Sequence, residues 1–138
     1  MGSWYTIGLC LGLGLGVGAV LIGILGSNVL GVGIGTIVGA AAGVGIGFAI
    51  GDSAEVIAGG AGGFLGALSA TAVVHGALRR GGTRLGIAAY LGVLGLLICL
   101  VALIPVGGYV EAVAIPLLAA RMRGRQAARF AGLRTLAK

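Results

Sequence analysis

Long uncharged apolar stretches fill most of the sequence, and short polar clusters separate them. Residues 1–51 carry no charged side chain, although one membrane span needs only about 20 residues. Gly26-Ser27-Asn28 divides this stretch, because these residue types favour turns. Asp52-Ser53-Ala54-Glu55 is a second break, and it doubles as a helix start, where Asp or Ser caps free N–H groups. The pattern predicts three spans, at about residues 4–25, 29–51 and 56–78.

The next apolar stretch, residues 85–120, carries a single charge, Glu111. A straight helix of this length would extend about 54 Å at 1.5 Å per residue, against a hydrocarbon core of about 30 Å. Pro105-Val106-Gly107-Gly108 is a strong break near its middle. We therefore expect a fourth span at about 85–104 and a short fifth helix at about 109–120. The fifth helix either crosses the membrane or re-enters it from one side, with Pro116 kinking it or lying near its end.

The last segment, residues 121–138, is a basic tail. Its apolar residues recur at helical spacing, which predicts a helix lying along the membrane surface. Clustered arginines beside a membrane favour anionic lipid headgroups, and they also anchor topology; both roles are open here. The candidate headgroup contacts are Arg121, Arg123, Arg125 and Arg129. The chain thus divides into a transmembrane domain, residues 1–120, and a juxtamembrane tail.

Charge is distributed unevenly along the chain. Its nine basic residues outnumber its three acidic ones, and all nine lie at 79–84 or from 121 onward. Basic loops beside apolar spans stay in the cytoplasm. Counting spans backwards from these loops predicts an outside N-terminus, a cytoplasmic C-terminus and all three acids on the outside, in a plasma or inner membrane. This distribution favours a topology signal over nucleic-acid binding.

Composition supports the same class of protein. The chain is 59% hydrophobic and 9% charged, whereas soluble domains are about 25% charged. The residues 11–18 alternate like a strand, but an isolated strand leaves its backbone unsatisfied in lipid. We therefore predict an all-α integral membrane protein with four transmembrane helices, a short fifth helix and a basic interfacial C-terminal helix.

Glycine, with 31 residues, recurs every four positions in the first three spans. Small residues at this spacing form a flat helix face, against which another backbone packs closely. The partner helix lies either in the same chain or in another copy, and so thin a molecule favours a homo-oligomer. The predicted packing positions are Gly8, Gly12, Gly16, Gly31, Gly35, Gly39, Gly43, Gly47, Gly51, Gly59 and Gly63.

Few residues offer chemistry within these spans. An ionisable side chain in a membrane segment is a candidate functional group. The candidates for ion or solute binding are Glu111, His75, Asp52 and Glu55. Glu111 either caps the fifth helix at the outer surface or binds a cation or proton, and His75 is either an interfacial histidine or a ligand. We expect no metal site, no cofactor and no catalytic centre, and we expect Cys10 and Cys99 to act as small apolar residues.

Two functions follow from these patterns. The first is a homo-oligomeric channel or small transporter for ions or small solutes, suggested by the glycine packing and the broken segment before Glu111. The second is a structural or accessory subunit that packs against another membrane protein or shapes the lipid bilayer. Neither requires nucleic acid or enzymatic activity.

Overall fold

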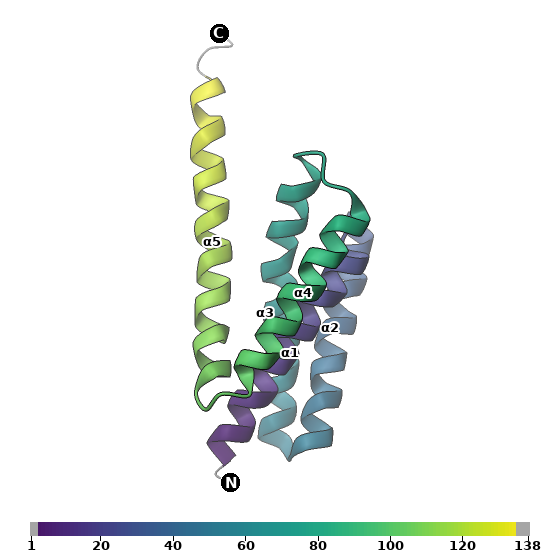
Figure 1. Ribbon diagram of the computed structural model, residues 1–138, viewed down its shortest axis with the longest axis vertical. Helices are drawn as coiled ribbons and strands as arrows, with labels where there is room; N and C mark the ends of the chain where they lie inside the picture. The colour runs from purple at the N-terminus through teal and green to yellow at the C-terminus, as the bar shows by residue number, and fades with distance from the viewer. Residues whose placement is uncertain (1–2, 135–138) are drawn as a thin grey trace.

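Five α-helices run alternately up and down in the computed structural model, which describes the backbone of residues 3–134 and the side chains of residues 4–124 (Figure 1). No strand occurs in this part of the chain. The helices are α1 (Ser3–Leu25), α2 (Val29–Ile50), α3 (Ser53–Leu78), α4 (Arg84–Ala102) and α5 (Gly107–Arg134). The first four are long and apolar enough to cross a membrane, and their bounds lie close to the four predicted spans.

The helices begin where short polar side chains replace missing backbone partners. Asn28 accepts a hydrogen bond from the Gly31 N–H at 2.6 Å, which caps α2. Thr83 caps α4 in the same way by accepting from the Gly86 N–H at 3.2 Å. At the start of α3, the Glu55 carboxylate accepts from the Asp52 N–H at 3.1 Å. These caps confirm that the breaks seen in the sequence are helix starts.

The last helix differs from the prediction. A short helix at about 109–120 followed by a separate surface helix was expected, but α5 is one helix of 28 residues with Pro116 inside it. Proline removes one backbone hydrogen bond, and here the helix continues beyond it through good helix formers such as alanine, arginine and leucine. The chain instead turns before α5, where Val106 has φ of 74°. The tail is therefore a continuation of α5 as far as the described residues reach.

Glycine backbones make the closest helix contacts. A methyl group at Gly43 of α2 would overlap the carbonyl oxygen of Gly59 on α3, and one at Gly63 of α3 would overlap that of Gly39. α1 packs against α3 in the same way, because a methyl group at Gly18 would overlap the carbonyl of Gly63. α3 thus contacts both α1 and α2 through backbone atoms.

The same kind of contact attaches the last two helices to α1. A methyl group at Gly16 of α1 would lie 2.7 Å from the Gly95 carbonyl oxygen on α4. A methyl group at Gly108 of α5 would overlap the Gly8 carbonyl. Every one of the eleven predicted packing glycines has another heavy atom of this chain close to the position of an added methyl group. The glycine pattern is therefore used within the chain, so it does not by itself call for a second copy.

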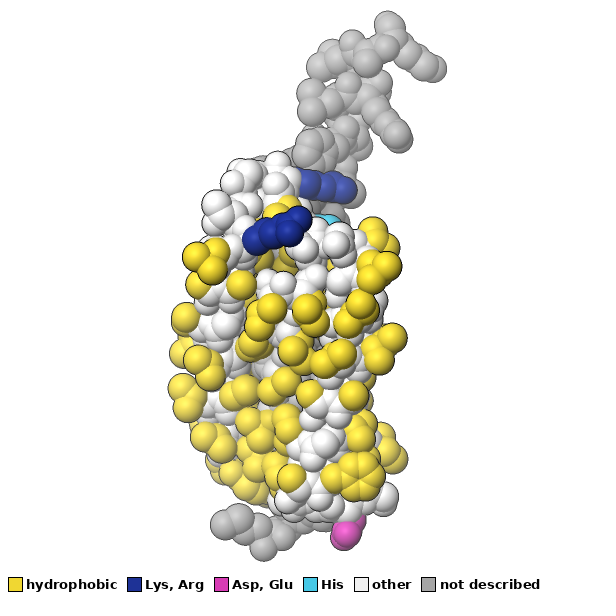
Figure 2. Space-filling view, turned by 90° about the vertical axis from the view of Figure 1, so that its right-hand side faces the viewer, with side chains coloured by type: hydrophobic (Ala, Val, Ile, Leu, Met, Phe, Trp, Pro, Cys, Tyr) yellow, Lys and Arg dark blue, Asp and Glu magenta, His cyan; other side chains and the backbone are white. Residues whose placement is uncertain are grey.

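Apolar side chains cover the sides of the bundle, and charges lie at its ends. Figure 2 shows a broad hydrophobic surface with arginines at one end and an acidic side chain at the other. Because the helices alternate in direction, the loop between α3 and α4 lies at the same end as Arg121 and Arg123, whereas Asp52 and Glu55 lie at the other end. The two ends are called the basic end and the acidic end below.

These contacts predict a difference between two glycines of α2. Gly43→Ala should destabilise the bundle by about 1–3 kcal/mol, because the methyl group forces α2 and α3 apart. Gly45 has no atom within 4 Å of an added methyl group, so Gly45→Ala should leave stability unchanged or slightly higher. Thermal unfolding of both variants in the same detergent measures the difference. Equal loss in both variants would contradict the assignment of Gly43 to a backbone contact.

Candidate functional site

A groove opens where α4 and α5 diverge. The two helices are joined at the acidic end and separate toward the basic end, with α3 behind them (Figure 1). The groove has a cavity volume of about 600 Å³. Cavities that bind small molecules in proteins have volumes of about 300–1,000 Å³. The groove is therefore large enough to hold a ligand.

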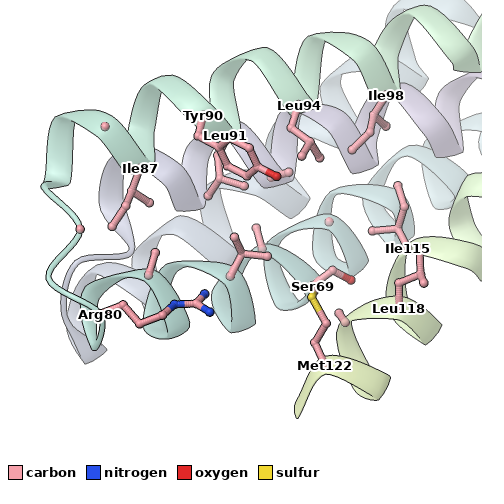
Figure 3. Close-up of a pocket in the computed structure, with 18 of the residues that line it drawn as sticks. Ser69, Arg80, Ile87, Tyr90, Leu91, Leu94, Ile98, Ile115, Leu118 and Met122 are labelled. Carbon is pink, nitrogen blue, oxygen red and sulfur yellow. The ribbon is translucent and has the colours of Figure 1, made fainter. Parts of the chain in front are cut away.

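The walls of the groove are mostly apolar. Ile87, Leu91 and Ile98 of α4 are buried and share one face of that helix, and Figure 3 shows them directed toward α3. α5 closes the deeper part with Ile115 and Leu118. The buried Ser69 of α3 contributes a hydroxyl to the lining. A ligand in this part of the groove would contact mainly aliphatic carbon.

The end of the groove nearest the basic loop is polar. Arg80 extends along this end from the α3–α4 loop (Figure 3). Thr83 and Gly86 also line it, and they form the first turn of α4. The N-terminus of a helix carries partial positive charge and unpaired N–H groups, so it favours anions. A helix N-terminus and a guanidinium group thus meet at the mouth of an apolar groove.

Hydrogen bonds attach α5 to the bundle at two points along its length. At the acidic end, the Tyr109 hydroxyl donates to the Trp4 carbonyl oxygen at 2.6 Å, and the Tyr5 hydroxyl donates to the Leu103 carbonyl oxygen at 3.0 Å. At the basic end, the Arg123 guanidinium donates to the Leu68 carbonyl oxygen of α3 at 3.1 Å. α5 therefore contacts α1 near its start and α3 at Arg123, on either side of the groove's lining residues Ile115 and Leu118.

The predicted site residues lie in three separate places. Glu55 is buried, with 6% exposure, and its Oε1 atom accepts from the Thr6 hydroxyl at 2.6 Å, while Asp52 beside it is exposed. Glu111 is buried between α1, α4 and α5. His75 is exposed at the basic end, in a second cavity of about 250 Å³ beside Arg79 and Arg123. The structure therefore does not combine the four candidates into one site.

The predicted headgroup arginines contribute less to the groove than the α3–α4 loop does. Arg121 and Arg123 are exposed on α5 and do not line the groove, and the side chains of Arg125 and Arg129 lie outside the described residues. Sequence reasoning assigned the loop around Arg80 to topology and missed its position at the groove. The signal was present as a basic residue followed by a helix cap, Arg80 and Thr83.

The two cysteines lie in α1 and α4. Cys10 is fully buried and Cys99 is partly buried, and neither forms a disulfide. The Cys99 thiol faces the Leu13 carbonyl oxygen at 3.9 Å. Within residues 4–124 no three His, Cys, Asp or Glu side chains are grouped as metal ligands.

Comparisons with protein-family models, with curated proteins and with solved structures found no match to this chain.

Proposed function

We propose that this chain is a non-catalytic membrane protein that binds an anionic phospholipid in the groove between α3, α4 and α5. The observation that carries the proposal is the polarity of the groove, which is apolar along its length and ends at Arg80 and the N-terminus of α4. A phospholipid has the matching arrangement of an aliphatic chain joined to a phosphate. This function develops the accessory role expected from the sequence.

The lining favours a lipid over a hydrated ion. An ion that enters an apolar cavity loses its hydration shell, and aliphatic side chains offer no polar atoms to replace the lost water. An acyl chain has no such penalty. Guanidinium groups and helix N-termini bind phosphate well, because both present N–H groups and positive charge to its oxygens. Arg80 and α4 therefore favour an anionic headgroup over a zwitterionic one.

The proposal predicts retention of one anionic lipid per chain. The purified protein is mixed with equal amounts of phosphatidylglycerol and phosphatidylcholine of the same acyl chains, and bound lipid is counted by native mass spectrometry. We expect preferential binding of phosphatidylglycerol. Arg80→Gln should lower its affinity at least about tenfold, because a hydrogen bond to a charged group contributes about 1.5–3 kcal/mol.

Two control variants distinguish binding in the groove from general electrostatic attraction of anionic lipid to the basic end. Arg84→Gln removes the same charge from the first residue of α4, which does not line the groove, so this variant should keep the preference. Val73→Trp should fill the groove and release the lipid, whereas Val93→Trp on the exposed side of α4 should not. Equal effects of Arg80→Gln and Arg84→Gln would contradict the proposal. So would a bound protein helix in place of the lipid.

The orientation in the membrane is part of the proposal. We place the basic end and the C-terminus in the cytoplasm and the acidic end and the N-terminus outside. The reason is that the arginines gather at one end of a bundle whose first four helices are able to span a membrane. Ser53→Cys should react with an impermeant maleimide added outside intact cells, and Gly81→Cys should react only after the membrane is opened. Both positions are exposed, and the buried Cys10 and half-buried Cys99 make the wild-type chain the blank. The reverse pattern would overturn this orientation.

A channel or small transporter is the second candidate function. Glu111 favours it, because an intramembrane carboxylate is a usual component of ion and proton pathways. In this proposal the protein acts as a homo-oligomer. The glycine face of α2 is already covered by other helices of the same chain, so a second copy would pack against the exposed apolar face of α2, where Ile37 is 71% exposed.

Flux into proteoliposomes tests this second function. Protein at known oligomeric state is reconstituted, and a pH-sensitive dye and an osmotic assay follow the entry of protons and small solutes. Transport through the Glu111 region should fall at least about tenfold in Glu111→Gln, as expected when a proton-relay group is removed. An intact wild-type protein without flux above empty vesicles would exclude this function and leave the lipid proposal standing.

A further inference from the structure

Glu111 lies one turn after the start of α5, at the contact of three helices. A methyl group at Gly12 of α1 would lie 3.2 Å from its Oε2 atom and 3.0 Å from the α-carbon of Gly108. The same methyl group would contact Ala102 of α4. The carboxyl group is therefore packed against the glycine face of α1, close to the space that a side chain at Gly12 would otherwise fill.

The surroundings of this carboxyl group do not stabilise a negative charge. Glu111 is 9% exposed, and its Oε2 atom is buried without a hydrogen-bond partner. α1 presents the backbone of Gly12, and α4 presents the Ala102 methyl group and, nearby, the neutral thiol of Cys99. α3 meets α5 farther along, through Arg123 and Leu68. Burying the charged form is unfavourable here, because nothing replaces the water that the Oε2 atom loses.

Glu55 provides an internal comparison. It is also buried, at 6% exposure, but both of its oxygens have donors. Oε1 accepts from the Thr6 hydroxyl and Oε2 from the Asp52 N–H. Hydrogen bonds to a carboxylate favour its charged form, whereas burial without them favours the neutral form. The two glutamates are similarly buried, but the Oε2 atom of Glu111 lacks the donor that the Oε2 atom of Glu55 has.

We propose that Glu111 is a proton-binding site: the carboxyl group holds a proton at neutral pH, and the neutral form allows α5 to pack against the glycine face of α1. The proton removes the charge that this contact could not solvate. Ionisation would leave an unpaired negative charge between α1, α4 and α5, which disfavours the docked position of α5. The inference stands on the packing of Glu111 and depends neither on lipid in the groove nor on transport.

Reaction with dicyclohexylcarbodiimide tests the proposal on the intact protein in detergent. The reagent reacts with a protonated carboxyl group: the proton moves to a carbodiimide nitrogen, the carboxyl oxygen adds to the central carbon, and rearrangement gives a stable N-acylurea. We expect the adduct on Glu111 and not on Glu55, with labelling that decreases as pH rises. Peptide mass spectrometry identifies the labelled residue, and Glu111→Gln should lose the adduct.

Stability against pH is the second measurement. An exposed Glu111 would release its proton near pH 4, at about the pKa of a free glutamate, whereas the docked group keeps it up to neutral pH. Docking should therefore weaken as pH rises from about 4 to neutral, by up to about tenfold per pH unit for one proton. Thermal unfolding over this pH range should show the decline in the wild type. Glu111→Gln imitates the neutral acid, so it should fold and lose the decline.

Three results would overturn the proposal. One is labelling of Glu55 as fast as Glu111. Another is protection of Glu111 by Na⁺ at constant pH, which would show a metal-cation site instead of a proton site. The third is a dependence of stability on pH that is the same in Glu111→Gln as in the wild type. If the reagent labels neither glutamate, this comparison of stability profiles is the deciding test.

Discussion

Backbone-to-backbone contact at glycine is the constraint on which the rest of this structure depends. Lipid tails are as apolar as the helix surfaces, so burial of apolar area gives little net drive for helices to associate in a membrane. Close approach replaces that drive with dispersion contacts. At Gly43 and Gly59, and again at Gly39 and Gly63, the two helix backbones are so near that a single methyl group would separate them.

The groove lies where close packing between glycine backbones ends, between α4 and α5. α1, α2 and α3 are joined by glycines along most of their length, and α4 is joined to α1 through Gly16 and Gly95. α5 has its glycine contact near its start, at Gly108, and a side-chain contact farther along, at Arg123. Between these points the larger side chains of α4 and α5 face each other across open space. Tight packing on one side of the bundle thus leaves a cavity on the other.

Electrostatics divides the two ends of the bundle. The basic end presents exposed arginines and the start of α4, where positive charge is solvated and open to an anionic headgroup. At the acidic end, two of the three carboxyl groups are buried, and their environments differ because Glu55 has donors and the Oε2 atom of Glu111 has none. The lipid proposal depends on residues at the basic end, and the proton proposal depends on Glu111 at the acidic end. Different variants therefore test the two proposals.

The sequence by itself determined the class of the protein, the number and bounds of the first four helices, and the separation of charge to opposite ends. These properties depend on local sequence signals, because the length of an apolar stretch, its turn residues and the order of the basic loops are all visible in the sequence. It misjudged the fifth helix, since Pro116 and the change to basic residues looked like boundaries but neither prevents helical backbone from continuing. Tertiary structure alone decided that the glycine faces meet within one chain and that Arg80 and Thr83 lie at the mouth of a groove. It also decided that the Oε2 atom of Glu111 is buried without a donor, while both oxygens of Glu55 have one. Periodicity shows which residues share a helix face, but which helix covers that face depends on contacts between residues far apart in the sequence.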